Sequence, residues 1–451
     1  MKPSRSDYGL GDQLTGMEGR TFDEASIRSR LQELKNTKGR LSRLISETQL
    51  SGENSDQSLE ELKRVSGEIK LLQKKLKKKL NQVRPGVHWS PRPVPIPHAI
   101  TNRPPPDSVL IAECDSHSVS EVEAYLASHP GASVWHRPVV SSFIVQTYGH
   151  RARYLCAFSG QGHIVGLLPL VQLKSRLFGN FLVSMPYFNY GGVLADTPAI
   201  ARKLIDGAEK VRKEVCARHL ELRHFQNIGL GLAQKTDKMT FWLSLPDNQT
   251  DLWNSFPPKL RSQIRRGERD LGDMKVGGAE LLEDFYRVFS INMRDLGTPV
   301  YGKSFFRNLL SALGDQAWVA VAYIDGRPAG AAFLTGFKNR MEIPWASTLR
   351  NFNHTSVNMI MYWRILEFAI DRGFEVFDFG RCSEGGGTFH FKKQWGAQPV
   401  QLHWDYVLPE REALPSLNPQ NPRFRLLIAA WRRLPVWCAN RLGPRIVRGL
   451  P

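Results

Sequence analysis

Apolar residues recur every three or four positions near the beginning of the chain, in two successive stretches. The first contains Ile27, Leu31, Leu34, Leu41 and Ile45; after the polar break SGENSDQ, the second has apolar residues at positions 59, 62, 69, 72, 76 and 80. This spacing is typical of helices that pack along one apolar stripe. We therefore expect an antiparallel coiled-coil helical hairpin over residues 22–83, preceded by a disordered N-terminus over residues 1–21.

The role of this hairpin stays open at the level of sequence. Its apolar stripe fits a packing or self-association arm, whereas the Lys-rich stretch KKLKKKL fits an arm that contacts RNA. The next segment, VRPGVHWSPRPVPIPHAITNRPPP, is rich in proline, which cannot continue a helix or a central strand. Residues 84–107 are therefore predicted to be a semi-rigid linker.

Beyond the linker, the pattern alternates between strands and helices, and it does so twice. Strand-like segments at 109–115, 154–171 and 220–225 enclose a helical stretch, IARKLIDGAEKVRKEVCARHL; the same order returns after residue 281. Gly162, Gly166 and Leu170 in the first pair of strands correspond to Gly326, Gly330 and Leu334 in the second. We predict a structural duplication of an α/β (α+β) unit, with domains at 108–246 and 247–410.

The final segment, residues 411–451, is predicted to be a basic amphipathic tail. Its last thirty-one residues contain seven arginines and no acid, with Phe424, Leu427, Trp431, Leu434 and Trp437 interleaved among them. Such a segment can lie on an anionic membrane surface. It can equally pack against its own domain and leave the arginines exposed.

The composition narrows the functional classes. A chain of 451 residues exceeds the ~250–300 residues at which single cores stop growing, which favours two domains. The net charge of +18 favours an anionic partner, and five scattered cysteines favour a reducing compartment. Because there is no apolar leader and no apolar run near the ~18 residues that span a bilayer, we expect a cytoplasmic protein, at most peripheral at the inner membrane.

Three segments of the second half carry candidate chemistry. In FPPKLRSQIRRGERD, a helical pattern brings together Lys259, Arg261, Arg265 and Arg266, which suits a pyrophosphate or an RNA backbone, or else forms a solvated basic face. In VFDFGRCSEGGG, Asp378 points away from its two phenylalanine neighbours and precedes Arg381 at the end of a strand. Asp378 would orient an acceptor amine, or simply pair with Arg381.

The third segment is TFHFKKQWGAQP. It places a titratable ring, two cations and a large aromatic close to the Asp378 loop: His390, Lys392, Lys393 and Trp395. A lysine held there would stabilise the oxyanion of an acyl-transfer intermediate. Since no nucleophile–histidine–acid pattern, zinc motif or phosphate-binding P-loop occurs, direct transfer without a metal or a covalent enzyme intermediate is favoured, with Cys382 a bystander.

Five segments form a joint pattern: KLRSQIRRGERD, MRDLGTPVYGKSFF, EIPWASTLRNFN, FDFGRCSEGGGTFHFKKQWGAQP and the closing WRRLP with RLGPRIVR. Together they resemble the Fem-type (FemAB) family of GNAT-like acyltransferases, and within it the branch associated with exosortase and PEP-CTERM exopolysaccharide systems. The resemblance begins near Val109 and leaves out the N-terminal hairpin.

The resemblance implies two tandem GNAT-like domains with mixed sheets flanked by helices and an acceptor bound between them. It assigns phosphate binding to Lys259, Arg261 and Arg265 and the transfer centre to Lys392, with Tyr301, Asp378 and Arg381 as further site candidates. The stretch STLRNFNHTSVN departs from the glycine-rich pattern of acetyl-CoA users, so ordinary acetyl-CoA binding loses support.

These observations lead to one favoured function and an alternative. We expect an acyl- or aminoacyltransferase that acts on an amine of a cell-envelope or exopolysaccharide precursor. No cofactor would be firmly bound; the anionic co-substrate would be acyl-CoA, acyl carrier protein or aminoacyl-tRNA. The catalytic set would be Asp378, His390 and Lys392, and Arg266, Trp395 and the other residues named above would bind substrate. The alternative is a non-catalytic nucleotide-sugar-binding or scaffold protein of an exopolysaccharide or protein-sorting system.

Overall fold

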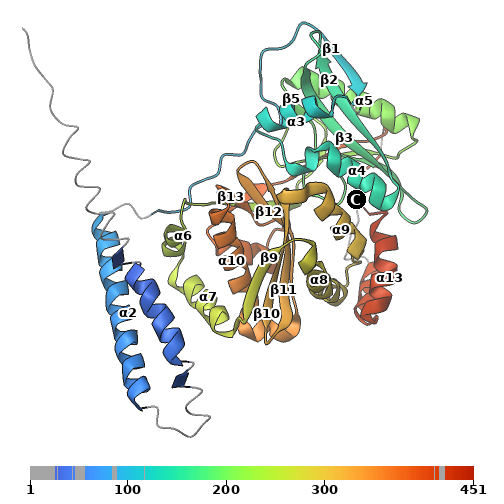
Figure 1. The fold of residues 1–451 in the computed structure, drawn as a ribbon. Helices are drawn as coiled ribbons and strands as arrows, with labels where there is room; N and C mark the ends of the chain where they lie inside the picture. The colour runs from blue at the N-terminus through green and yellow to red at the C-terminus, as the bar shows by residue number, and fades with distance from the viewer. Residues whose placement is uncertain are drawn as a thin grey trace, which may run out of the picture. The chain divides into compact units, whose positions relative to one another are not determined.

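A computed structural model describes residues 26–45 apart from 28 and 43, 56–83, 89–415 apart from 116 and 411, and 422–450 (Figure 1). The chain divides into two compact units, Met1–His88 and Trp89–Pro451. The predicted disordered segment 1–21 lies outside the described residues. Each unit is described by itself below.

The first unit consists of two helices. One comprises the described residues between 26 and 45, and the other is α2 (Asp56–Val83). They bury Leu31, Leu34, Val65 and Ile69 against one another, and Arg30 forms an ion pair with Glu68 at 3.4 Å. The helices expected from the apolar spacing are therefore present and packed together; their supercoiling and any self-association stay predictions.

The second unit contains two sheets, each with helices on its faces. We call the first sheet and its helices the first lobe. Its strands are ordered β1-β2-β3-β4-β6-β16-β7, with β5 beside β3. The elements are β1 (Val109–Glu113), α3 (Val119–Ser128), α4 (Pro138–Tyr148), β2 (Arg151–Ser159), β3 (Ile164–Ser175), β4 (Gly179–Val183), β5 (Leu194–Ala195), α5 (Pro198–Glu214), β6 (Leu220–His224), β7 (Ala233–Lys235) and β16 (His403–Val407).

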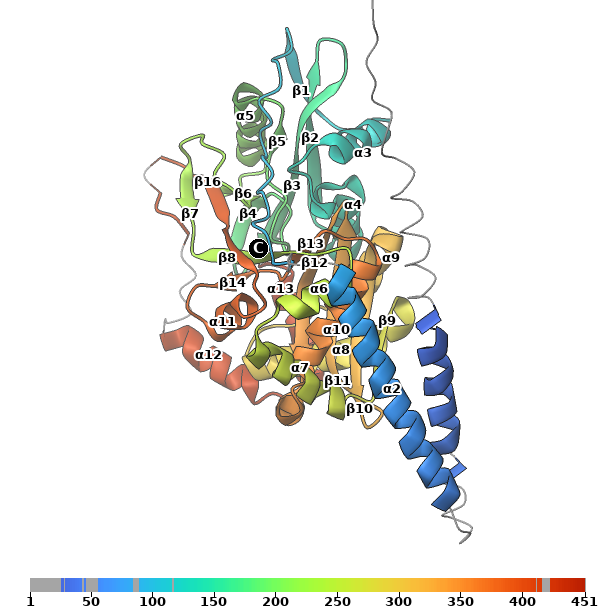
Figure 2. The same cartoon turned by 90° about the vertical axis from the view of Figure 1, so that its left-hand side faces the viewer.

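The second lobe is built around the other sheet, ordered β14-β8-β13-β12-β11-β10-β9, with β15 beside β8 (Figure 2). Its elements are β8 (Lys238–Ser244), α6 (Gln249–Ser255), α7 (Pro258–Asp270), β9 (Asp273–Gly277), α8 (Leu282–Leu296), α9 (Lys303–Leu313), β10 (Ala317–Ile324), β11 (Arg327–Phe337), β12 (Arg340–Thr348), η4 (Arg350–Thr355), α10 (Val357–Asp371), β13 (Val376–Asp378), β14 (Cys382–Ser383), α11 (Gly387–Lys393) and β15 (Gln398–Gln401).

The two lobes repeat one motif, as the matched glycines predict. The β2–β3 and β10–β11 hairpins turn at Gly162 and Gly326, whose φ angles are 85° and 70°, and each hairpin has a bulge after the residue paired with its second glycine. A Cβ on Gly166 would lie 2.9 Å from Ile200 of α5, and one on Gly330 would lie 3.1 Å from Met361 of α10. Each glycine therefore lets a helix pack closely on the sheet.

The lobes also exchange strands. β8 lies within the predicted first domain, 108–246, but pairs with β13 of the second lobe, whereas β16 lies within the predicted second domain, 247–410, and pairs with β6 of the first lobe. Residues 89–107 run along both sheets as well: the Arg92 N–H donates to Ser244 Oγ at 2.7 Å, and the Thr101 N–H donates to the Ala195 carbonyl at 3.1 Å. The lobes are thus joined by backbone pairing, and the ranges 108–246 and 247–410 stay a sequence-based division.

Two cores cover the faces of the second sheet. One face packs against α8 and α9, and α9 also contacts α4 of the first lobe; the Phe143 and Phe305 rings lie 5.0 Å apart across that junction. The other face packs against α7 and α10. The face toward α8 and α9 is therefore the one that meets the first lobe.

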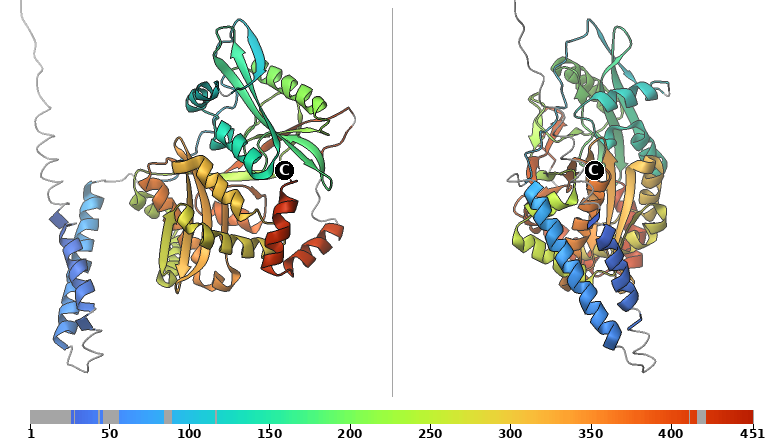
Figure 3. Two further views of the ribbon diagram at one scale, coloured as in Figure 1. Left: turned by 45° about the vertical axis from the view of Figure 1, so that its right-hand side comes forward. Right: turned by 60° about the vertical axis from the view of Figure 1, so that its left-hand side comes forward.

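The C-terminal segment forms α12 (Pro422–Arg432) and α13 (Val436–Val447), which pack against α8 (Figure 3). Arg294 of α8 donates to the Leu434 carbonyl at 2.8 Å, and a Cβ on Gly443 would lie 2.8 Å from the Val300 backbone. The tail thus packs on its own unit. Among the described helices, none is both long and apolar enough to cross a membrane.

Candidate active site

Two carboxylates lie side by side where the lobes meet. Glu342 of β12 and Asp378 of β13 are register partners in a parallel strand pair, and they are only 5% and 0% exposed. Asp378 points away from Phe377 and Phe379, whose rings belong to the core on the opposite face of the sheet. This confirms the orientation expected from strand alternation.

Asp378 accepts hydrogen bonds from four donors. Its Oδ2 accepts from the Tyr190 hydroxyl and from the Trp242 indole N–H at 2.9 Å, and its Oδ1 accepts from the Thr240 hydroxyl and from the Gly380 N–H at 2.8 Å. Burial and the Asp378 charge raise the pKa of Tyr190 well above its usual value, so this hydroxyl stays a donor. Asp378 is therefore held by four donors and does not pair with Arg381; its catalytic role stays a prediction.

Glu342 is bound by side chains of the first lobe. Its Oε2 accepts from the Trp135 indole N–H at 2.7 Å, and its Oε1 accepts from the Asn189 amide at 3.1 Å. Burial, together with the adjacent Asp378 charge, raises the pKa of Glu342 to about 8. At neutral pH Glu342 therefore favours its protonated form.

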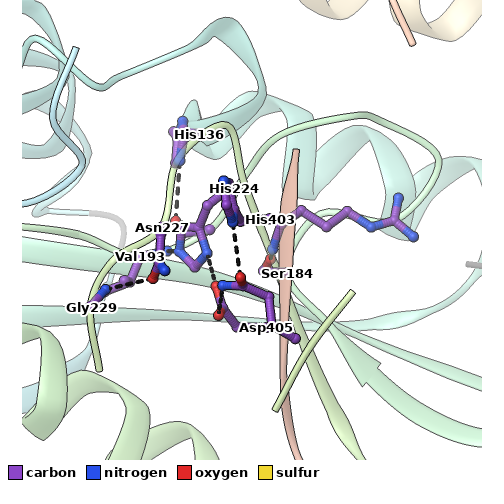
Figure 4. A network of polar contacts seen from close by, with 11 residues as sticks. His136, Ser184, Val193, His224, Asn227, Gly229, His403 and Asp405 are labelled. Atoms are coloured by element: carbon purple, nitrogen blue, oxygen red, sulfur yellow. Dashed lines mark hydrogen bonds and ion pairs between the residues drawn. The ribbon is translucent and has the colours of Figure 1, made fainter. Parts of the chain in front are cut away.

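The loop that carries Asn189 and Tyr190 is fixed from the first sheet. The Val193 N–H donates to His224 Nε2 at 2.9 Å, so the proton of this ring is on Nδ1, which donates to Asp405 Oδ2 at 2.8 Å (Figure 4). Gly192 lies so close that a Cβ there would be 2.2 Å from the His224 ring. Since Nε2 is occupied by a backbone donor, this His–Asp pair supports the loop and is not a base for a nucleophile.

At the end of β13 the chain turns away from β12. Gly380 has a φ of 73°, and a Cβ on it would lie 2.7 Å from the Ile343 carbonyl, so only glycine fits. Lys392 of α11 is 2% exposed and donates to the Gly380 carbonyl at 2.6 Å and the Arg381 carbonyl at 3.1 Å. Burial lowers the pKa of Lys392 to about 8. An ammonium group has three N–H donors, which leaves one for another acceptor.

Beside this turn, two arginines contact one tryptophan. The guanidinium carbons of Arg223 and Arg381 lie 4.3 and 5.0 Å from the Trp404 ring. Arg223 is paired with Glu221, whose Oε1 lies 2.8 Å from both Nε and Nη2, and it also donates to the Phe188 carbonyl at 2.7 Å. The Trp404 Nε1 is buried without a hydrogen-bond partner. Arg381 is exposed, and no carboxylate among the described residues forms an ion pair with it. The group has an excess positive charge and unused donors.

Tyr301 lies near these cations. Its ring is stacked on Phe305 at 4.6 Å and lies 5.7 Å from Trp345 and 6.0 Å from Tyr187 of the first lobe. Burial raises the pKa of Tyr301, and the charges of Arg381 and Arg223 oppose that rise. The structure therefore brings Tyr301, Arg381, Lys392 and Asp378 to one region between the lobes.

The basic residues of α7 lie elsewhere, on the face of the second sheet that carries α10. Arg266 donates to the His354 carbonyl of η4 at 2.9 Å, and a Cβ on Gly267 would lie 2.7 Å from the Ser356 carbonyl that precedes α10. Lys259 and Arg265 are exposed; Arg265 also lies 5.3 Å from the Trp253 ring. Arg261 is half-buried, and its Nε lacks a partner. Arg266 thus borders the beginning of α10.

Two further predicted site residues are not brought to the carboxylates. Trp395 is fully buried among Phe256, Tyr362 and Phe379, so the structure places it in the core instead of at a binding surface. His390 is exposed on α11, two residues from the buried Lys392; side chains at that spacing leave a helix in different directions. Its catalytic role stays a prediction.

Sequence reasoning did not select Glu342, Tyr190, Arg223 or Trp404. Glu342 had one visible sign, because it is a single acid inside the apolar strand MEIPW, and Arg223 alternates with Glu221 in the equally apolar LELRHF. Tyr190 and Trp404 had no such sign in the sequence, since their partners are remote in sequence. Within the described residues, no group of three His, Cys, Asp or Glu side chains is placed to hold a metal ion.

A family model matches part of the second lobe. Residues 258–393 match a family model described as an acetyltransferase (GNAT) domain. A search of curated proteins gave no match. The matched segment begins at α7 and ends at α11, so it includes Glu342, Asp378 and Lys392.

Solved structures extend the likeness to both lobes. FemX has a TM-score of 0.53 at 16% identity, with 65% of this chain and 96% of FemX covered. A tandem GNAT protein from the clavulanic acid biosynthesis pathway has a TM-score of 0.44 at 13% identity, covering 66% of this chain and 97% of that one. L-PGS from Bacillus licheniformis has a TM-score of 0.40 at 12% identity, covering 66% and 98%. The family match and the FemX fold confirm the predicted tandem GNAT-like architecture.

Proposed function

We propose that this chain is an acyltransferase that moves an acyl or aminoacyl group from an activated donor to an amine of an anionic cell-envelope or exopolysaccharide precursor. The observation that carries the proposal is the end of β13, where Gly380, Arg381 and Lys392 lie beside the Glu342–Asp378 pair within the GNAT-matched segment. A fold of this kind supports acyl transfer in general; the donor and the acceptor are proposed here.

The chemistry needs a charged group beside the reacting carbonyl. The neutral amine attacks the carbonyl carbon of an ester or thioester; the C–N bond forms, the C–O or C–S bond breaks, and the amine proton ends on the leaving group. The third N–H of Lys392 would stabilise the oxyanion formed on the way. The hydrogen bond from the Gly380 N–H to Asp378 fixes the turn at Gly380. Lys392 is held in place because it donates to the Gly380 carbonyl of that turn.

The acceptor is proposed to bind through an acidic group beside Lys392. Arg381 is exposed and has no carboxylate partner among the described residues, and the buried Trp404 Nε1 has no hydrogen-bond partner. Arginine binds phosphate and carboxylate oxygens in pairs, so this group suits a phosphate or carboxylate on the acceptor. Tyr301 would form the apolar side of the same subsite.

The cluster of α7 is proposed to bind the phosphates of an anionic co-substrate. Arg266 borders the beginning of α10, where backbone N–H groups and the helix dipole also favour anions, and Lys259 and Arg265 are exposed on the same helix. Acyl-CoA, acyl carrier protein and aminoacyl-tRNA all carry phosphate groups that this cluster would bind. The motifs shared with the exosortase-associated Fem-type branch support an exopolysaccharide or envelope acceptor and a reaction at the cytoplasmic side.

The test is transfer by the purified full-length chain from each donor class to amino-sugar acceptors, together with mass spectrometry of molecules that copurify. We expect product with one donor class, and loss of the copurifying anion in a Lys259→Ala/Arg265→Ala variant. If an anion copurifies but no donor class yields product, the non-catalytic nucleotide-sugar-binding or scaffold alternative replaces this proposal.

A further inference from the structure

The outer face of α13 combines an exposed tryptophan with arginines. Trp437, Arg441, Arg445 and Arg448 recur every three or four residues and are all exposed; Trp437 is 70% exposed. Leu442 lies at the edge of this face at 42% exposure. The arrangement leaves a large aromatic side chain in solvent between cations.

The inner face of the same helix is fixed. Ala439, Gly443 and Val447 are buried, and the Tyr187 hydroxyl and His150 Nε2 both bind the Arg448 carbonyl, at 2.8 and 3.0 Å. The exposed face is therefore not needed for packing α13 against its own unit. It is the outward side of a helix whose inward side is already occupied.

The tip of the β3–β4 hairpin extends this surface. A Cβ on Gly449, just after α13, would lie 2.9 Å from Ser175 and 3.0 Å from Phe178, so the two segments touch. The tip exposes Lys174, Arg176 and Leu177, and Leu177 is 74% exposed. Apolar and basic side chains thus continue from the helix onto a loop of the first lobe.

The combined surface has no acidic side chain of its own. Residues 422–450 and 174–180 contain no Asp or Glu. In the described part of the chain, Arg433, Arg441, Arg445 and Arg448 form no ion pair. Several unpaired cations surround exposed tryptophan and leucine side chains. This arrangement is complementary to a binding partner whose outer layer is anionic and whose layer just below is apolar.

We propose that the basic–apolar patch, defined as the outer face of α13 with the tip of the β3–β4 hairpin, binds the surface of an anionic membrane. A polyanion such as RNA would use the arginines but would leave Leu177 and Leu442 without apolar contacts. Lipid headgroups bind the cations, while the region just below them accepts tryptophan and leucine.

This position has a consequence for the site between the lobes. Tyr187, which binds the Arg448 carbonyl, is also the first-lobe ring that faces Tyr301 at 6.0 Å. An acceptor carried by the membrane would therefore arrive next to the proposed acceptor subsite. The membrane proposal does not depend on that reaction, because binding is measured without substrate.

The experiment is flotation of the full-length protein with vesicles of phosphatidylcholine alone or mixed with phosphatidylglycerol, at low and physiological ionic strength. We expect binding only to the mixed vesicles. Arg441→Gln/Arg445→Gln should weaken it by about thirtyfold, since each cation near an anionic surface contributes roughly fivefold in affinity. The separate variant Trp437→Ser/Leu177→Ser should also weaken vesicle binding, and the binding that remains should be more salt-sensitive than that of the unmodified protein.

The matched control is Leu110→Ser/Arg327→Gln, which removes an equally exposed leucine and arginine outside the patch. It should bind as the unmodified protein does. Absence of binding to the mixed vesicles, or equal binding by the patch and control variants, would overturn the proposal. Single-stranded RNA that binds the patch while the serine variant keeps full vesicle affinity would also overturn it, in favour of a general polyanion surface.

Discussion

Glu342 and Asp378 belong to adjacent parallel strands of the second lobe, yet each accepts hydrogen bonds from the first. Trp135 and Asn189 bind Glu342, and Tyr190 binds Asp378. Buried charge is costly unless it is hydrogen-bonded, so the carboxylate pair favours one relative placement of the lobes. That placement also sets where Arg381 and Tyr301 meet the first lobe.

Replacing Tyr190 with phenylalanine should destabilise the protein by about 1.5–3 kcal/mol, because a buried carboxylate would lose a donor that solvent cannot replace. Denaturant unfolding measures this. The control is Tyr323→Phe, whose hydroxyl donates to Asp284 at 2.6 Å in a partly exposed place. Its cost should stay below about 1 kcal/mol, and equal costs for both variants would show that the Tyr190 contact contributes little.

The Glu342 carboxyl should make the protein less stable as pH rises. Its pKa is about 8 in the folded state against about 4.5 when unfolded, so between these values the unfolded state binds fewer protons. The stabilising contribution is full below pH about 4.5 and is lost as pH rises through about 8. Glu342→Gln has no such titration, so its unfolding free energy should lack this decline.

Buried histidines lower the stability as pH falls, which is the opposite pH dependence to that of Glu342. Their effect is the same in both proteins and cancels when the two are compared. Burial lowers the pKa of His129 to about 4 and of His136 to about 3, so both the unmodified protein and the variant lose stability as pH falls below about 6.5. The informative quantity is the difference in unfolding free energy between the two forms at pH about 5 and about 9. A difference that does not change with pH contradicts the raised pKa of Glu342.

Much of the fold follows from local pattern. The repeated order of strands and helices is visible because apolar periodicity marks each element, and Gly166 and Gly330 mark where a helix packs closely on a sheet. The exchange of β8 and β16 is not visible, since both strands read as ordinary members of the lobe next to them in sequence. Strand pairing between lobes depends on edges that only the folded chain defines.

The site was predictable only in part, for a similar reason. Asp378, Arg381 and Lys392 are close in sequence, so a motif-dense segment reveals them together. The donors to Glu342 come from more than one hundred and fifty residues away, where no local pattern links them. Trp395 shows the converse, because a large aromatic beside candidate site residues looks the same in sequence whether it faces a ligand or the core.

Arg381→Gln should weaken binding of small phosphate ligands between the lobes. A hydrogen bond to a charged group contributes about 1.5–3 kcal/mol, so the affinity for uridine diphosphate or pyrophosphate should fall roughly tenfold to hundredfold, as measured by calorimetry. Arg327→Gln, at the exposed first residue of β11, is the matched control. If both variants bind as the unmodified protein does, Arg381 is not an anion-binding group.

Lys392→Met should lower the rate of transfer by about 100-fold once the donor is known, because loss of one oxyanion donor typically costs that much. Methionine keeps the size and apolar stem of the buried lysine, while Lys393→Met alters an exposed neighbour on the same helix and should leave the rate unchanged.

Lys392 also holds the Gly380 and Arg381 carbonyls, so its loss would loosen the turn. A structural role alone would reduce stability without a pH effect on turnover. If the ammonium stabilises the oxyanion, the activity of the unmodified protein should decline as pH rises through about 8, where Lys392 loses its proton, and Lys392→Met should lack that decline.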